Sequence, residues 1–518
     1  MKGKIVFWLS TLLLVASFAA ARVEFGVTSF DASDFQNPEQ LDELCSGGAD
    51  AFWCTHRDDQ LSLITTKSVD VFFDPAGEIV AMFAKQQRGQ DFNGRYNLNN
   101  NQNLIPYDAS LPSGTVLIDE SYLAPQDVTG DWRRSSETEL VGTFSYRLSG
   151  EQGEFAVTKQ LTVSALNNTI GVELDVRRIG ELAADAAPVA VRYAVPGISR
   201  QETPTVRLGQ GSSHTENPLE QPVTNPTYIS IHNRERSTGF AMILRPQGGE
   251  PAGDELIALS LADRPVITMG KVLPPIADAS VTLNLDYYGG PNELVRYFQE
   301  GYLDLPGLFS PNLLGRLSLV ILALLQGIHG VLGNWGLSII ALTLLFRILI
   351  WPLITLQTKS MIGMQELQPK LQALQKKHKD NKEKLTEETM KLYKEAGVNP
   401  AGGCLPILLQ MPIFIMLWRV FINFEFNEGF LWVPDLGLAD PFYLLPILYV
   451  GIMVGQSFLM SRGNPQSLRQ QLMINVIFVF FIITFPAAVT LYWITSMGVQ
   501  VGQHYLIQRT SGAKPATA

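Results

Sequence analysis

Cysteine and metal-binding patterns are scarce in this chain. Its 518 residues include three cysteines, and the six histidines are scattered, without HExxH or CxxC spacing. A disulfide-dense scaffold is therefore excluded, metal catalysis has no support, and we expect neither a metal nor a cofactor. Cys45 and Cys54 lie nine residues apart and can form one disulfide in an oxidising compartment, whereas Cys404 is expected to be a buried thiol in an apolar run.

Long apolar runs are absent between residues 22 and 310, whereas they dominate the rest of the chain. Charge divides in the same way: residues 22–310 hold 39 acidic and 21 basic side chains, and residues 311–518 hold 10 acidic and 16 basic ones. The first part contains no nucleophile motif, phosphate loop or conspicuous carboxylate pair, so we expect no enzyme. The uneven distribution instead predicts a multi-domain membrane protein.

The first 21 residues have the layout of a secretory signal. Lys2 and Lys4 precede an apolar run from Ile5 to Phe18, and small residues follow at Ala19 to Ala21. The run lies at the lower limit for a membrane span. The pattern predicts export of the following domain, and both a cleaved signal peptide and a retained anchor stay open.

Residues 22–305 are predicted to form an exported all-β domain. Ile170, Val172, Leu174 and Val176 alternate with polar residues, and residues 281–287 repeat the pattern. Turn sequences at residues 74–77 and 167–168 indicate hairpins. So many short alternating strands favour a large antiparallel sandwich. A short amphipathic helix at residues 292–301 is expected to close this domain.

The second half is predicted to be an all-α membrane core with five spans. The apolar stretches cover residues 335–357, 404–421, 442–460, 472–485 and 487–506. The loop from Lys359 to Glu395 carries nine lysines, whereas the loop from Phe421 to Pro441 carries no basic residue and four acidic ones. By the positive-inside rule, the first loop and the tail at residues 510–518 are cytoplasmic, and the second loop lies outside.

Two further segments complete the predicted organisation. Residues 306–333 include a strongly apolar stretch. If it crossed the membrane, the nine-lysine loop would lie outside, so we expect an amphipathic helix at the outer membrane surface. Residues 358–400 repeat leucines at helical spacing on both sides of "HKDNKE". This predicts a cytoplasmic helical hairpin within the core domain of residues 334–509. A basic arm beside a membrane can meet anionic lipid, a ribosome or another protein.

Arg347 stands within the first of the five spans. A guanidinium there costs at least a few kcal/mol, and its backbone lies about 15 Å from the cytoplasmic end of the span. The five spans contain no Asp or Glu that could pair with it. We therefore expect a water-filled cavity that opens to the cytoplasm. Thr343, one turn earlier, lies on the same helix face.

Four side chains from other spans are further candidates for the wall of this cavity. They are Gln410, Asn475, Tyr492 and Trp493. Each could equally be satisfied inside the helix bundle. The apolar stretch at residues 472–485 measures only about 21 Å as a helix, which is short for a bilayer and would thin it locally.

Several motifs in order resemble the YidC membrane protein insertases, relatives of the Oxa and Alb proteins. They are "GNWGLSIIALTLLFRILIWPL", "MQELQPKLQAL", "LYKEAGVNPAGGCLPILLQMPIFIMLW", "DPFYLLPIL" and "FPAAVTLYWITS". The resemblance implies a five-helix core with a hydrophilic groove that receives polar parts of nascent membrane proteins at Arg347. Thr343 and Tyr492 match positions near the substrate. The exported half looks like the β-supersandwich domain of the Gram-negative type.

The resemblance also implies an inner-membrane insertase and chaperone that works alone or with the Sec translocon. Ribosome–nascent chain complexes and the signal recognition particle with its receptor would be partners, and no nucleic-acid substrate is expected. The short, weakly basic tail departs from tail-mediated ribosome binding. A membrane transporter and a membrane-tethered carbohydrate-binding or carbohydrate-processing protein are the alternatives. Against a transporter, the five spans lack the internal repeats that transporter folds usually show.

Overall fold

The protein is described from a computed structural model. The described residues are 26–30, 61–65, 69–84, 111–136, 138–164, 167–180, 186–196, 205–216, 222–232, 240–249, 257–261, 266–378, 381–396, 405–426, 428–460 and 465–510. The predicted signal, Cys45, Cys54, Cys404 and the tail beyond residue 510 lie outside this set. The chain forms two compact units, Arg22–Pro311 and the part from Asn312 onward.

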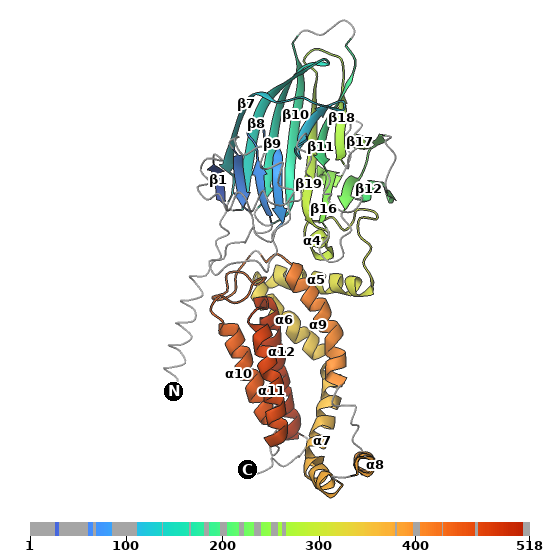
Figure 1. Ribbon diagram of the computed structural model, residues 1–518, viewed down its shortest axis with the longest axis vertical. Helices are drawn as coiled ribbons and strands as arrows, with labels where there is room; N and C mark the ends of the chain where they lie inside the picture. The colour runs from blue at the N-terminus through green and yellow to red at the C-terminus, as the bar shows by residue number, and fades with distance from the viewer. Residues whose placement is uncertain are drawn as a thin grey trace. The chain divides into compact units, whose positions relative to one another are not determined.

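The first unit is a large region of antiparallel β-sheet. Its described strands are β1 (Gly26–Phe30), β2 (Leu61–Thr65), β3 (Val69–Phe73), β4 (Ile79–Ala84), β5 (Thr115–Ile118), β6 (Ser121–Tyr122), β7 (Gln126–Arg134), β8 (Glu139–Gly150), β9 (Gly153–Ser164), β10 (Thr169–Ile179), β11 (Val189–Pro196), β12 (Thr205–Gln210), β13 (Ser213–Glu216), β14 (Val223–Thr224), β15 (Tyr228–His232), β16 (Phe240–Pro246), β17 (Ile257–Leu261), β18 (Val266–Leu273) and β19 (Ser280–Pro291). Nine strands form one sheet in the order β13-β12-β15-β16-β19-β10-β9-β8-β7. Six strands form a second sheet, β14-β17-β18-β11-β5-β6, and β1 to β4 form a third. Figure 1 shows the long strands β7 to β10 of the nine-stranded sheet.

Period-two alternation accounts for the core of this unit. The four apolar residues predicted to face inward at positions 170, 172, 174 and 176 lie on β10 and are all buried. On β19, Leu283, Leu285 and Tyr287 are buried in the same core. Because successive side chains on a strand point to opposite faces, one face of each strand meets this core. The predicted alternating strands are confirmed.

Both predicted hairpins are present. The turn at residues 74–77 joins β3 to β4, and Asp74 Oδ1 accepts hydrogen bonds from the backbone N–H groups of Ala76 and Glu78 at 2.9 and 2.8 Å. Gly77 adopts φ 68°, a left-handed conformation that glycine adopts readily. The turn at Asn167 and Asn168 joins β9 to β10, which pair from Val163 and Ile170 onward.

One buried lysine interrupts the apolar core. Lys159 on β9 is fully buried, and its Nζ donates to Gly114 O at 2.9 Å. Burial lowers the pKa of the Lys159 ammonium group. Glu78 is also buried, and burial with the nearby Asp74 raises the pKa of its carboxyl group to about 8. The sequence pattern predicted neither burial.

The first unit ends in a tyrosine-rich cap. The predicted helix at residues 292–301 is α4 (Leu294–Gln299), where Glu293 caps the N-terminus. Tyr288, Tyr297 and Tyr302 are buried together beside it. Arg245 places its guanidinium 3.9 Å from the Tyr302 ring centroid and pairs with Asp286 at 2.9 Å. These contacts fix the segment that follows the last strand against the sheet.

The second unit is helical. Its described helices are α5 (Leu313–Leu332), α6 (Trp335–Leu349), α7 (Trp351–Lys377), α8 (Lys382–Glu395), α9 (Leu405–Asn423), α10 (Leu444–Met460), α11 (Pro465–Ile482) and α12 (Ala487–Thr510). Helix α12 packs against α6, α7, α9 and α10, and α11 packs against α10. Helix α5 packs against α6 and α9, and it lies crosswise to α10, α11 and α12 in Figure 1.

A sharp corner joins α5 to α6. Gly333 ends α5 with φ 61°, and the side chain of Asn334 accepts from the Leu337 N–H to begin α6. The imidazole of His329 stacks on the Trp335 indole, with ring centroids 3.7 Å apart and an interplanar angle of 13°. The left-handed glycine and the asparagine cap together let two helices with different directions adjoin.

The segment predicted to span the membrane at residues 335–357 consists of two helices. Helix α6 ends at Leu349, and α7 begins at Trp351 and continues without a break to Lys377. Pro352 explains the interruption, because proline has no N–H for a helical hydrogen bond and its ring clashes with the preceding turn. The first arm of the predicted hairpin is therefore the continuation of a helix that starts within the predicted span. The break predicted in "HKDNKE" lies between α7 and α8.

By length and composition, one of the described helices is long and apolar enough to cross a membrane. It is α5, with 20 residues. Shorter apolar helical stretches cover Trp335–Leu349, Gln410–Asn423 and Leu444–Phe458. The helix of full spanning length is thus the one that charge placement predicts to lie on the surface. The described helices of the predicted spans are shorter, or carry polar residues along the part that would cross.

Candidate functional site

Arg347 occupies the last turn of α6 and is almost completely buried, with 8% of its surface exposed. Its position follows from the proline break, because α6 ends two residues later. The partial negative charge at a helix C-terminus favours a cation there. The break therefore places the guanidinium at the end of a helix and inside the helical bundle.

The guanidinium binds a serine that sequence reasoning did not single out. Ser496 on α12 is 5% exposed, and its Oγ accepts from Arg347 Nε at 3.0 Å and also from Nη2. Within the described residues, no ion pair joins Arg347 to a carboxylate. The available sequence signal was weak: Ser496 follows Tyr492 by four residues, so both lie on one face of α12.

Tyr492 and Gln410 extend this polar arrangement to a third helix. Tyr492 is 4% exposed, and its hydroxyl accepts a hydrogen bond from Nε2 of the half-buried Gln410 on α9. Tyr492 and Ser496 lie one turn apart on α12. We call Arg347, Ser496, Tyr492 and Gln410 the Arg347 cluster. It joins α6, α12 and α9, so three of the six predicted groove residues, with Thr343 as a neighbour, are close together.

Thr343 lies one turn before Arg347 and is 2% exposed. Its hydroxyl donates to Ile339 O of its own helix at 2.6 Å. A threonine that bonds its own backbone satisfies its donor without a partner helix. The hydroxyl donor of Thr343, beside the cluster, is therefore satisfied. Its oxygen can still accept a hydrogen bond.

Trp493, predicted for the same groove, instead forms the centre of an aromatic contact. Its indole lies 5.4 Å from the Phe414 ring on α9, 5.5 Å from Tyr449 on α10 and 5.4 Å from Phe485, measured between centroids. Trp493 directly follows Tyr492, so the two side chains leave α12 about 100° apart. One of them joins the polar cluster and the other packs the bundle.

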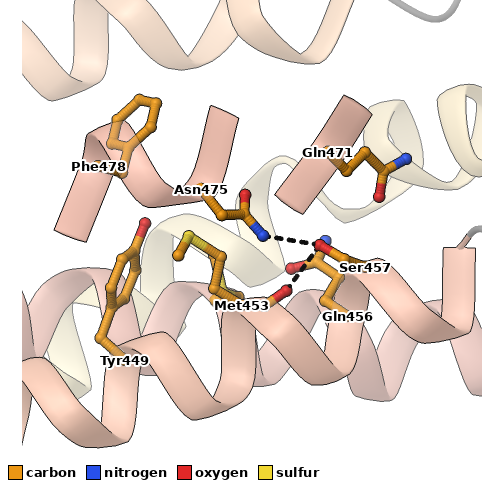
Figure 2. A pocket seen from close by; sticks show the side chains of 8 residues that line it. Tyr449, Met453, Gln456, Ser457, Gln471, Asn475 and Phe478 are labelled. Carbon is orange, nitrogen blue, oxygen red and sulfur yellow. Dashed lines mark hydrogen bonds between the residues drawn. The ribbon is translucent and has the colours of Figure 1, made fainter. Parts of the chain in front are cut away.

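Asn475 also lies apart from the cluster. It sits on α11, and its Nδ2 donates to Ser457 Oγ on α10 at 2.9 Å (Figure 2). Both residues line a pocket between these two helices, and Tyr449 and Phe478 are at its other end. The sequence could identify Asn475 as a polar residue in an apolar stretch, but it could not tell which neighbouring helix would satisfy it.

A second polar link joins α12 to α7 beyond the proline break. Gln503 is 1% exposed, and its Nε2 donates to Trp351 O and to Thr355 Oγ1, both at 3.2 Å. Sequence reasoning missed this residue as well. The contact fixes the first turn of α7 against α12 and so stabilises the break that positions Arg347.

At the N-terminal end of α10, one residue of the predicted acidic outer loop has a structural role. Asp440 is 2% exposed and accepts from the Leu445 N–H at 2.7 Å, the Phe442 N–H at 3.0 Å and Trp432 Nε1 at 3.1 Å. A carboxylate at a helix N-terminus satisfies free N–H groups and interacts favourably with the helix dipole.

The described residues contain no group of three or more His, Cys, Asp or Glu side chains that could hold a metal ion.

Comparisons with known proteins identify the relatives of this chain. A family described as "60Kd inner membrane protein" matches residues 327–514. A protein named membrane protein insertase YidC from Deinococcus radiodurans is 35% identical over 374 residues, covering 71% of this chain and 82% of that protein. One of the same name from Ectopseudomonas mendocina is 40% identical over 201 residues, covering 38% and 35%.

A solved structure shares the fold. The crystal structure described as an active YidC insertase with the first transmembrane domain resolved matches with a TM-score of 0.54, covering 86% of this chain and 92% of that one, at 21% identity. At that identity the match supports the arrangement of elements alone. It includes both a large antiparallel β region and the helical region that carries the Arg347 cluster.

Proposed function

The chain belongs to the YidC family of membrane protein insertases, inner-membrane proteins that are not enzymes, and we propose that it receives the hydrophilic parts of its clients at the Arg347 cluster. One observation carries this proposal. A buried guanidinium in an apolar helix binds a neutral serine, with no carboxylate pair within the described residues. Its positive charge is therefore available to attract a guest.

The hydrogen-bonding capacity of arginine supports the same conclusion. A guanidinium carries five N–H donors, and the single Ser496 oxygen engages two of its nitrogen atoms. The remaining donors need acceptors, and in a bilayer these are water or polar groups of a client segment. A carboxylate in such a segment would be attracted more strongly than a neutral group.

The proposed membrane arrangement keeps the five-span core. Residues 335–357, 404–421, 442–460, 472–485 and 487–506 cross the inner membrane, with the hairpin at residues 358–400 in the cytoplasm and the β unit in the periplasm. Helix α5 lies at the outer surface. Its crosswise direction relative to α10 to α12 supports this position (Figure 1), because these helices would run along the bilayer normal.

The groove proposal assigns a sequence of events. The basic hairpin meets the emerging client, a hydrophilic segment of the client enters from the cytoplasm and contacts Arg347, and its apolar segments partition into lipid. Hydrophobic partition supplies most of the driving force. Nascent membrane proteins are the substrates. The Sec translocon, ribosome–nascent chain complexes, and the signal recognition particle with its receptor are proposed partners.

A charge-reversal experiment tests the role of Arg347. Arg347→Glu should impair insertion of a client with an acidic translocated loop more than insertion of the same client with its loop acids changed to Asn and Gln. The matched control is Arg133→Glu, the same charge change at an exposed position of β7. Insertion into proteoliposomes is measured by protease protection. Equal impairment of both clients, or none, would contradict electrostatic capture.

A further inference from the structure

A second polar site lies between α10 and α11, with Met497 of α12 also in its lining. Its cavity has a volume of about 290 Å³. At one end lie the polar side chains of Gln456, Ser457, Gln471 and Asn475, and at the other lie the rings of Tyr449 and Phe478, as Figure 2 shows. No charged side chain is among the described residues of the lining. Any ligand of this pocket is therefore selected by neutral hydrogen bonds and by apolar contact.

The polar end is held in place by hydrogen bonds between the two helices. Asn475 Nδ2 donates to Ser457 Oγ at 2.9 Å, and Ser457 Oγ donates to Met453 O at 3.0 Å. The serine proton is therefore used within α10. Each carboxamide has two N–H donors, so Asn475 keeps one, and Gln471 adds more. This end of the pocket is suited to a ligand that offers acceptors, such as carbonyl oxygens.

The polarity of the pocket changes along the helix axes. Ser457 lies three residues before the end of α10, and Tyr449 lies eight residues earlier, about 12 Å along the axis. Under the proposed topology, α10 ends and α11 begins at the cytoplasmic surface. The amides then lie near that surface, and the aromatic rings lie toward the bilayer centre. A phospholipid of the cytoplasmic leaflet has the same gradient, with ester carbonyls above and acyl chain below.

We propose that this pocket binds one acyl chain, with its ester linkage, of a glycerophospholipid from the cytoplasmic leaflet. The proposal rests on the topology of the proposed function. Ester carbonyls accept from the N–H groups of Gln471 and Asn475, and the chain lies along Met453, whose flexible thioether adapts to an apolar ligand. Because no charged side chain is among the described residues of the lining, we expect binding to be independent of the head-group charge.

The surroundings favour a lipid over a polar side chain of a client helix. Met473 and Val476 on α11 are 58% and 57% exposed, and Phe458 on α10 is 55% exposed. In a bilayer, acyl chains cover such exposed apolar side chains. A lipid beside α10 and α11 is already at the site, whereas α6 and α9, which carry Arg347 and Gln410, contribute no described residue to its lining.

The test uses the full chain in lipid nanodiscs without any client. Phosphatidylcholine carrying a photoactivatable diazirine, near the ester in one preparation and at mid-chain in another, is irradiated, and labelled peptides are mapped by mass spectrometry. Label near the ester should mark Gln471 and Asn475, and the mid-chain label should mark Tyr449 and Phe478. Phosphatidylglycerol carrying the same probes should give the same map, since head-group charge is not recognised.

Paired variants distinguish the pocket from ordinary lipid contact. Met453→Trp fills the cavity and should abolish the pocket label, whereas Met473→Trp makes the same change at an exposed position and should leave it unchanged. Asn475→Leu removes a donor and should weaken the ester-proximal label about fivefold, the effect of one hydrogen bond. This variant keeps the side-chain size and tests the proposal even if Met453→Trp fails to fold.

Four outcomes would overturn the proposal or its premise. Equal label on all exposed helix faces, insensitive to Met453→Trp, would show ordinary lipid contact only. Label at Met473 without label in the pocket would leave the topology intact and reject the lipid site. Absence of label on both would reject the membrane position of α10 and α11. In a separate translation assay with a client, a probe at position 478 that captures a nascent chain and no lipid would show that the pocket serves clients.

Discussion

The contact between Ser496 and Arg347 predicts that removing the Ser496 hydroxyl destabilises the protein more than removing the similarly buried Ser338 hydroxyl. Ser496→Ala removes the acceptor of two guanidinium nitrogen atoms. A hydrogen bond to a charged group contributes about 1.5–3 kcal/mol, so we expect the free energy of unfolding to fall by about 2 kcal/mol. That loss corresponds to a change of about 30-fold in the ratio of folded to unfolded protein.

Ser338→Ala is the matched control. Ser338 on α6 is fully buried, and its hydroxyl donates to Asn334 O of its own helix at 2.7 Å. Such a bond back to the helix backbone contributes little to stability, so this variant should unfold like the parent chain. Ser496→Thr retains a hydroxyl and should recover most of the loss in Ser496→Ala.

The assay is reversible unfolding of the purified chain in mixed micelles, with helix content followed by circular dichroism. Insertion of an acidic-loop client into proteoliposomes is measured on the same preparations. Ser496→Ala should also reduce insertion, because Arg347 loses the contact that orients it. Equal stability of Ser496→Ala and Ser338→Ala would refute the view that Ser496 holds the guanidinium.

Three further predictions concern the aromatic contact, the β unit and its removal. Trp493→Ala should lower the free energy of unfolding by about 3 kcal/mol because it opens a cavity in the bundle, measured in the same micelle assay; no loss would contradict the packing of four rings. Burial lowers the pKa of His232 to about 3 from its ordinary 6.5, so its contribution to stability is present above pH 6.5 and is lost as pH falls toward 3. We expect the free energy of unfolding of the β unit to fall by about 2 kcal/mol between pH 7 and pH 5. This loss should appear as faster hydrogen exchange in β15 of the full chain, after correction for intrinsic rates. His232→Gln should remove this part of the pH dependence, and an unchanged dependence in that variant would contradict the prediction. Deletion of residues 22–300 should leave insertion largely intact in a complementation assay, and complete loss would place essential function in the β unit.

Local patterns predicted much of the fold. The alternation at residues 170–176 defines β10 because one buried face of a strand imposes period two. The turn at Asp74 and the break near Asn381 were readable because their residues form local hydrogen bonds with the backbone. Neither needs knowledge of a distant partner.

Long-range partners were the part that could not be predicted. Lys159 stands in a strand at a core-facing position, and only the approach of the loops that carry Gly77 and Gly114 explains its burial. The same applies to α6 and α7, where Pro352 signals a kink but the bond from Gln503 to Trp351 O depends on α12.

The candidate site shows the same division. Arg347 was identified because an unpaired charge in an apolar stretch is costly, and Tyr492 and Gln410 were plausible neighbours. Ser496 carried no such signal, since a serine in an apolar helix can bond its own backbone. Trp493 and Asn475 were assigned to the groove from residue type alone. Their directions around α12 and α11 place them in an aromatic contact and in the pocket with Ser457.

The most direct test of the central claim is site-specific photo-crosslinking during translation of a small membrane protein. A probe at position 410, beside Tyr492 in the Arg347 cluster, should capture the hydrophilic segment of the nascent chain while it is being inserted. A probe at position 331, on a residue of α5 that is 85% exposed, serves as the control. Crosslinks at position 410 that disappear once insertion is complete are the predicted result. Absence of crosslinks at 410, with a client that is nevertheless inserted, would contradict the account.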